Sequence, residues 1–118
     1  MLLLKRVQRV RYFKDYCLSL GEGDTKLLLK KLAPTRLVKN AFREAVEKAE
    51  DSGASAEDLR TLLGRGRAKK GIFEGDLEEG ELEIGQVSAI ISRRQSVAEV
   101  MNELVAAYQR AAKKDYLF

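Results

Sequence analysis

The sequence predicts a mainly helical fold, and three observations support this prediction. Apolar residues recur at three- and four-residue steps over several long stretches, which is the period of one helix face. Capping signals stand before two of these stretches. The chain has 118 residues, of which 45% are apolar and 34% charged, which suits one folded domain with a modest core rather than a disordered chain. We therefore expect residues 1–118 to form a single domain.

Residues 1–20 form the first expected helix. Its apolar residues follow the helical period, basic residues lie mostly between them, and Gly21 and Gly23 end it. A basic amphipathic helix of this kind either packs on the rest of the protein or lies on an acidic membrane surface, and packing is the favoured interpretation. The apolar positions are Leu3, Val7, Val10, Phe13, Cys17 and Leu20.

Residues 34–64 are expected to form a helical hairpin. The leucine-rich stretch before them, from Asp24 to Leu32, is ambiguous, and we favour a short extended segment. Pro34 suits the start of a helix, and a broad apolar stripe then continues to about Glu50. Ser55 caps a second, shorter helix that ends at Gly64.

Residues 64–86 are expected to form a long loop, because glycines interrupt the stretch repeatedly and weaken any helix or strand. Four basic residues stand near its start, and six acidic residues follow. Loops this long and this rich in charge are more often functional than merely connecting. The basic residues are Arg65, Arg67, Lys69 and Lys70, and the acidic residues are Glu74, Asp76, Glu78, Glu79, Glu81 and Glu83.

Two helices are expected within residues 84–114. A nearly continuous apolar run from Ile84 to Ile91 predicts a buried helix that begins near Glu83. Ser96 and Glu99 then form a capping box before an amphipathic final helix. Its apolar face contains Val97, Val100, Met101, Leu104, Val105 and Tyr108.

Composition narrows the classes of function. Histidine is absent and Cys17 is the single cysteine, so we expect no metal site and no histidine general base from this chain. A lone cysteine in an apolar pattern fits a buried thiol in a reducing cytoplasm. No stretch is apolar enough for a membrane span. The net charge of +4 is too mild to require a nucleic-acid partner.

Four segments resemble, in the right order, the nitronate monooxygenase family, formerly called 2-nitropropane dioxygenase, which includes the flavin-dependent enoyl-acyl-carrier-protein (ACP) reductase II. The clearest is Gly75-Asp76-x-Glu78-x-Gly80, followed by Gly85-Gln86 and a small apolar run. Upstream, Gly23-Asp24-Thr25 and the segment Thr35-Arg36-Leu37-Val38-Lys39-Asn40 are similar to two further family segments. The resemblance covers about residues 13 to 112, and residues 1–12 depart from the family pattern.

The resemblance implies that this chain is a fragment. Family members are (β/α)8 TIM-barrel flavoproteins that hold FMN at the C-terminal face of the barrel, and the match is to their C-terminal helical portion. The glycine-rich strand ends that bind the flavin phosphate and the histidine credited with catalysis lie in the portion that is not matched. We therefore expect no catalytic residue in this chain, no turnover by the chain alone and no retention of FMN without the missing barrel portion.

The resemblance also implies which residues approach the flavin site. Gly85 and Gln86 match the cofactor side, and Glu78, Glu79, Gly80 and Glu81 match a loop at the mouth of the active site. The structural alternatives are that Gly85 caps a helix, that Gln86 satisfies a buried backbone group and that the acidic residues form a solvated loop face.

Three hypotheses about function follow. The first is the C-terminal part of an FMN-dependent oxidoreductase of the nitronate monooxygenase or enoyl-ACP reductase II type. The second is a small helical interaction protein, whose apolar helix faces over residues 35–50 and 97–112 bind a partner or a second copy. The third is a basic nucleic-acid-binding module that uses Arg65, Arg67, Lys69 and Lys70. If these helices normally cover the strands of a barrel, their apolar faces have no such strands to cover in this chain. We therefore expect exposed apolar surface and self-association.

Overall fold

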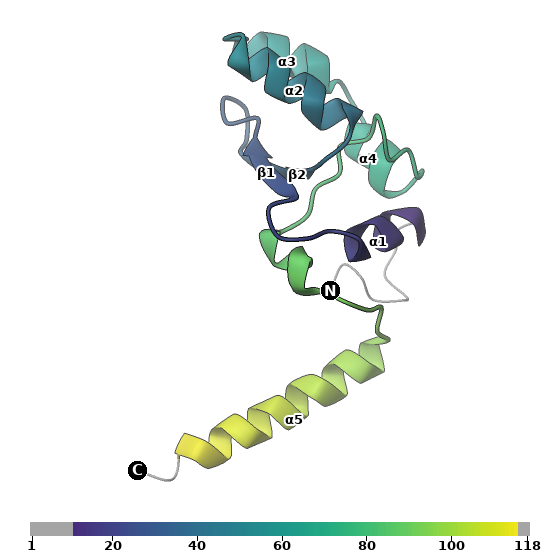
Figure 1. Ribbon diagram of the computed structural model, residues 1–118, viewed down its shortest axis with the longest axis vertical. Helices are drawn as coiled ribbons and strands as arrows, with labels where there is room; N and C mark the ends of the chain where they lie inside the picture. The colour runs from purple at the N-terminus through teal and green to yellow at the C-terminus, as the bar shows by residue number, and fades with distance from the viewer. Residues whose placement is uncertain (1–10, 116–118) are drawn as a thin grey trace. The chain divides into compact units, whose positions relative to one another are not determined.

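The computed structural model of the protein describes residues 11–115. The chain divides into two compact units, one over Gln8–Ser92 and the other containing Arg93–Phe118. Figure 1 shows their elements in chain order. The first unit holds α1 (Arg11–Leu18), β1 (Thr25–Leu28), β2 (Thr35–Val38), α2 (Ala41–Asp51), α3 (Ala56–Leu63), α4 (Arg67–Ile72) and the 3-10 helix η1 (Gln86–Ile90), and the second holds α5 (Val97–Asp115).

Strands β1 and β2 form an antiparallel hairpin, with Thr25 opposite Val38 and Leu28 opposite Thr35. The extended segment expected between Asp24 and Leu32 is thereby confirmed. The helix expected from Pro34 begins instead at Ala41, so the prediction for residues 35–38 was wrong. These residues take their backbone partners from β1, and strand pairing overrides the local helical pattern.

Helices α2 and α3 pack together as the predicted helical hairpin (Figure 1). The Asn40 side chain caps α2 by accepting from the backbone N–H of Arg43 at 2.9 Å. Ser55 and Asp58 form a full capping box at the start of α3. Each cap satisfies amide donors that a helix start leaves without partners, which is worth about 1 kcal/mol.

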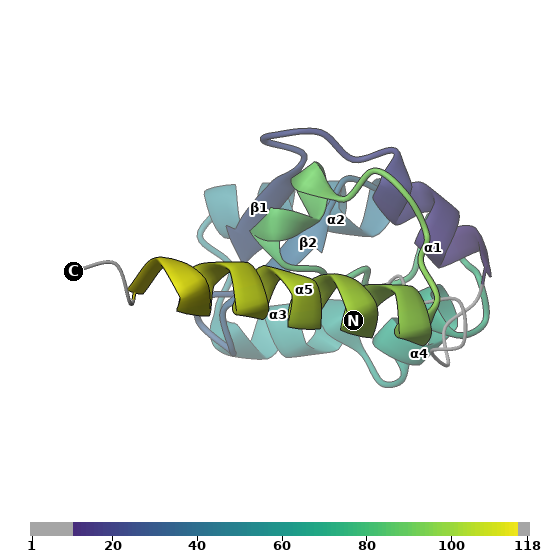
Figure 2. The ribbon, with the colours of Figure 1, turned by 90° about the horizontal axis from the view of Figure 1, so that it is seen from below.

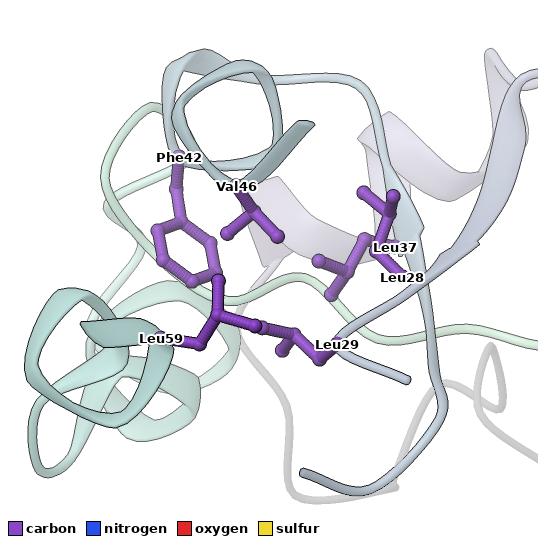
Figure 3. Packing of buried hydrophobic residues seen from close by; sticks show 6 residues of the cluster. All are labelled: Leu28, Leu29, Leu37, Phe42, Val46 and Leu59. Atoms are coloured by element: carbon purple, nitrogen blue, oxygen red, sulfur yellow. The ribbon is translucent and has the colours of Figure 1, made fainter. Parts of the chain in front are cut away.

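The main hydrophobic core lies between the β-hairpin and the helical hairpin. Figure 3 shows its six buried side chains, which come from both strands, the residue after β1 and both helices. Burial of each stabilises the fold by about 1.5–3 kcal/mol. They are Leu28, Leu29, Leu37, Phe42, Val46 and Leu59.

Helix α1 is the described part of the helix expected over residues 1–20, and residues 1–10 lie outside the part of the chain that the structure describes. It buries Phe13, Lys14 and Cys17 and contacts η1. The buried thiol of Cys17 matches the expectation for a lone cysteine in an apolar pattern.

Two segments after Gly64 differ from the sequence-based expectation. The stretch predicted as a loop over residues 64–86 contains α4. Gly66, the residue before this helix, has a left-handed backbone conformation (φ 73°), which glycine adopts without strain. The buried helix expected from Glu83 is instead the five-residue η1. Its Val87 and Ile90 side chains are 66% and 79% exposed, so the apolar run does not mark a core helix.

The second unit confirms the final predicted helix. The N–H groups of Ser96 and Glu99 are bonded to each other's side chains, as in a capping box, and Arg93 pairs with Glu103 at 2.6 Å. Figure 2 shows α5 along its length as one unbroken helix. Among the residues that the structure describes, no helix has both the length and the hydropathy required to cross a bilayer.

Candidate functional site

The acid- and glycine-rich segment after α4 is bound to the edge of β2. The N–H of Val38 donates to the carbonyl of Leu82 at 3.1 Å, and the N–H of Ile84 donates to the carbonyl of Arg36 at 3.3 Å. Leu37 and Glu83 form an isolated antiparallel bridge between these bonds. The segment therefore has a fixed register on β2, although the sequence predicts only a loop.

Asn40 attaches the turn before this segment to the start of α2. Its side-chain NH2 donates to the carbonyl of Leu77 at 3.0 Å and to that of Gly80 at 2.7 Å. The same side chain caps α2 through its oxygen, and the residue is almost fully buried. A further bond runs from the N–H of Phe42 to the carbonyl of Glu78 at 3.1 Å. One amide side chain therefore fixes both the helix start and the acidic turn.

Gly71 and Gly80 are required where two backbones cross. A Cβ at Gly80 would lie 2.2 Å from the Cα of Gly71, and a Cβ at Gly71 would lie 2.6 Å from Cδ2 of Leu82. Neither φ lies in the left-handed range, so close approach rather than conformation demands glycine at both positions. The turn at Gly80 consequently sits directly on α4.

Arg67 at the start of α4 links the helical hairpin to the same turn. Its guanidinium donates to the carbonyls of Leu62, Leu63 and Glu79. It also stacks over the Phe42 ring, 4.5 Å from the ring centre. Three carbonyl partners use most of the donors of this cation, so Arg67 has a structural role in the fold.

The other charges of this stretch largely pair with each other. Lys69 pairs with Glu74 at 3.5 Å and Lys70 with Asp76 at 3.3 Å. The Asp76 carboxylate also accepts from the N–H groups of Glu78 and Glu79, and these bonds help to lower its pKa. Exposed pairs such as these stabilise little, but they place an acid beside Lys69 and Lys70, two of the four basic residues on which the nucleic-acid hypothesis depends.

Glu81 and Glu83 form a pair of interacting acids, on one side of the extended segment. The side chain of Leu82 between them is fully buried, and Glu81 itself is only 8% exposed. Burial, the negative charge of Glu83 and a hydrogen bond between the two carboxyl groups raise the pKa of Glu81 to about 7, while Arg67 acts in the opposite direction. Near neutral pH, Glu81 therefore exists in both protonation states.

Gly85 and Gln86 lie at the opposite end of β2 from the acidic turn. A groove of about 310 Å³ runs beside them and is lined by Pro34, Thr35, Arg36, Glu83, Ile84 and Gly85. Gly85 has ordinary backbone angles (φ −69°, ψ 153°), and a Cβ added to it would meet nothing within 4 Å. Nothing in the described chain therefore requires glycine at this position.

The six residues singled out from the sequence thus divide into two groups. Glu78, Glu79, Gly80 and Glu81 form the turn held by Asn40, and within it Gly80 and Glu81 are buried while Glu78 and Glu79 are exposed. Gly85 lines the groove, and Gly85 and Gln86 are both exposed. The structure does not bring the two groups together, because β2 separates them.

The sequence does not predict the structural roles of three residues in this arrangement. Asn40 was part of a matched segment, while Arg67 and Glu83 were counted only as members of charged clusters. Asn40 and Arg67 donate to backbone carbonyls, and Glu83 interacts with Glu81 two residues away. Such contacts leave no periodic signal in a sequence. A larger hollow of about 410 Å³ lies over charged residues of α2, away from both groups.

Comparisons with known proteins identify the fold. No family model matches the sequence, and no curated protein matches it. Among solved structures, FabK from Thermotoga maritima matches with a TM-score of 0.70 and 22% identity, over 90% of this chain and 33% of FabK. Its M276A mutant matches with a TM-score of 0.75 and 17% identity, over 96% of this chain and 33% of that chain. The chain is mainly helical, has the fold of a part of the TIM-barrel protein FabK and spans about a third of its length.

Proposed function

We propose that this chain is the helical third of an FMN-dependent oxidoreductase of the enoyl-ACP reductase II type, and that it works only with a barrel portion like the rest of FabK. The observation that carries the proposal is the likeness to FabK over 90% or more of the chain, together with the matched glycine and acid motif that lies within it. Of the two branches of the suggested family, the likeness to FabK favours the enoyl reductase over the nitronate monooxygenase.

The residues around Gly85 fit one edge of a flavin site. The space beyond Gly85 is open, and its neighbours Ile84 and Val87 offer apolar contact beside it. Glycine at a position that neither backbone angle nor packing requires is typical of a place where a ligand or another backbone approaches closely.

The chain does not supply a whole flavin site. Arg36 is the nearby cation in the groove, and its guanidinium already donates to the carbonyl and hydroxyl oxygens of Thr25 at 3.3 and 3.2 Å. The flavin phosphate would thus be held by the barrel portion. When bound, FMN would carry electrons between a reduced nicotinamide and an enoyl thioester, and this chain's residues would position and enclose it.

Within the mouth loop the proposed roles differ between residues. Glu78 and Glu79 are exposed and remain the candidates for lining the mouth of the active site. Gly80 and Glu81 are buried under the turn, so we assign them to the shape of the loop. Gln86 is exposed at the start of η1, next to Gly85, and stays a candidate for the cofactor side. The intact enzyme would work in the cytoplasm.

A graft tests the proposal. This chain, from Arg11 onward, would replace the matched third of Thermotoga maritima FabK. Purified graft protein should be yellow, contain bound FMN and reduce an enoyl thioester with a reduced nicotinamide. FabK truncated before the grafted third is the negative control. A graft that folds as judged by circular dichroism yet contains no flavin would contradict the proposal.

The same graft tests Gly85 directly. Gly85→Leu should leave the isolated chain's unfolding free energy within about 0.5 kcal/mol of the parent, because the added side chain points into open space. In the graft it should reduce FMN occupancy at least tenfold. Gly21→Leu is the matched control, because Gly21 is also exposed and has no left-handed φ, and it should change neither quantity. Equal FMN occupancy in the two variants would refute a cofactor role for Gly85.

A further inference from the structure

The extended segment that pairs with the edge of β2 carries two acids on one face. Side chains at positions i and i+2 of an extended chain point to the same side, so Glu81 and Glu83 share a face. Leu82 points to the other side and is fully buried. The carbonyl of Leu82 and the N–H of Ile84 bond to β2 and hold the segment extended. Pairing with β2 therefore keeps the two carboxyl groups together.

The two ends of this segment are held differently. At one end, Asn40 bonds to the carbonyl of Gly80, and the backbone of Gly80 crosses that of Gly71 in direct contact. At the other end, Gly85 is exposed, and a Cβ added to it would meet nothing within 4 Å. Residues 82–85 can therefore separate from β2, beginning at the groove, while the turn before them stays in place.

The charges around the pair do not offset a second negative charge. Glu81 is only 8% exposed, and the charges that act on it are those of Glu83 and Arg67. The guanidinium of Arg67 already donates to three backbone carbonyls and lies 3.5 Å from the Glu79 carboxylate. Arg36, which lines the groove with Glu83, donates to oxygens of β1. Ionisation of both acids thus places two negative charges on one face, one of them buried.

We propose that the Glu81–Glu83 pair is a proton-dependent switch that controls whether residues 82–85 stay paired with β2. While the two carboxyl groups share a proton, the segment remains on β2 and lines the groove. When both groups ionise, the segment separates from β2, and Glu83, Ile84 and Gly85 leave the wall of the groove. The inference concerns the groove whatever ligand occupies it, so it does not depend on the oxidoreductase function.

The switch should operate as pH approaches neutrality. Burial, the negative charge of Glu83 and the hydrogen bond between the two carboxyl groups raise the pKa of Glu81 from 4.5 to about 7. The paired form therefore binds this proton more tightly than the released form, in which water solvates the side chain. The ratio of released to paired segment should rise about tenfold for each pH unit between 4.5 and 7 and then level off.

Hydrogen exchange of the full chain, followed residue by residue by NMR, tests the switch. The N–H groups of Val38 and Ile84 both bridge β2 and the segment and lose their partners on release. Their protection factors, which correct for the faster intrinsic exchange at higher pH, should fall at least tenfold between pH 5 and pH 8. In about 1 M urea they should change less than twofold, because release exposes little surface, whereas Val46 in the core of α2 should lose protection.

Two substitutions separate the acid pair from the rest of the segment. Glu81→Gln cannot ionise, so the protection of both amides should vary less than twofold between pH 5 and pH 8. Glu83→Gln removes one charge and offers an amide donor to the Glu81 carboxylate, so at pH 8 it should raise the protection of both amides at least threefold above the parent. Glu78→Gln is the matched control, because Glu78 is exposed in the neighbouring turn, and it should behave as the parent does.

Two results would overturn the proposal. Protection of Val38 and Ile84 that equals that of Val46 at every urea concentration would show that the segment opens only when the whole unit unfolds. A pH dependence that persists unchanged in Glu81→Gln would show that other groups control the segment. If circular dichroism shows that Glu81→Gln does not fold, Glu83→Gln decides alone, and an unchanged protection at pH 8 refutes the switch.

Discussion

Glu81 is buried beside a second acid, and this arrangement should make the stability of the chain depend on pH. Its pKa is raised from 4.5 to about 7 in the folded state. The folded chain therefore binds this proton more tightly than the unfolded chain, so the unfolding free energy should fall as pH rises from about 4.5 to 7 and then level off. The loss should reach about 3 kcal/mol.

The substitution Glu81→Gln should remove most of this dependence. The variant should be more stable than the parent at pH 8 and close to it at pH 5, as measured by urea unfolding. Glu78→Gln is the control, because that residue is exposed in the same turn. Equal slopes of unfolding free energy against pH for the parent and Glu81→Gln would contradict the burial of this carboxyl.

Below pH 4, loss of the ionised forms of Glu47, Asp58 and Asp76 should destabilise every variant, because their pKa values are lowered in the fold.

The acidic turn and the start of α2 should behave as one element, because Asn40 bonds to both. Asn40→Asp retains an oxygen that caps the helix, but it replaces the NH2 group that serves the carbonyls of Leu77 and Gly80 with an acceptor. The two carbonyls then have no donor and face a negative charge. The free energy of unfolding should therefore fall by about 2 kcal/mol or more. Urea unfolding at pH 7 measures this loss.

Hydrogen exchange separates the two roles of Asn40. In Asn40→Asp, the N–H of Phe42, which donates to the turn, should exchange faster, while the N–H of Arg43, which donates to the cap, should remain protected. Asn40→Ala, which removes the cap as well, should expose both. Equal protection of Phe42 in the parent and the Asp variant would mean that the turn is held without this side chain.

The elements differ in how far the sequence predicts them. Helices α3 and α5 follow from their caps and periodicity, because nothing beyond the local chain opposes the pattern. The start of α2 and the conformation of residues 35–38 do not follow, since β1 provides strand partners that a helical pattern cannot indicate. The prediction of a long buried helix at η1 is wrong, because a continuous apolar run does not by itself show whether its side chains are buried. Val87 and Ile90 of this run are exposed to solvent.

The sequence predicts which residues belong to the candidate site but not how they are arranged in space. The family motif singles out Gly80, Glu81, Gly85 and Gln86. Of these, Gly80 is held by Asn40, Glu81 donates its N–H to the carbonyl of Arg67, and Gly85 lines the groove. Their division into a buried turn and an open groove depends on Asn40, the Gly71–Gly80 crossing and the guanidinium of Arg67. Most of these contacts join segments far apart in the chain, so local sequence patterns do not predict them.

At the scale of the whole chain, the two units should respond differently to protein concentration. The first unit is stabilised by its own core between the β-hairpin and the helical hairpin. Amides of α2 and α3 should therefore exchange slowly and at a rate independent of concentration, because such segments open only when the unit unfolds.

Amides of α5 should behave in the opposite way if the predicted self-association covers its exposed apolar face. Their protection should increase with protein concentration, because association stabilises the helix by mass action. In Leu104→Glu the protection of α5 should be low at every concentration, while that of α2 is unchanged. Hydrogen exchange followed by mass spectrometry over a hundredfold range of concentration measures both. Protection of α5 that is high and independent of concentration would show that self-association has no role in the stability of this helix.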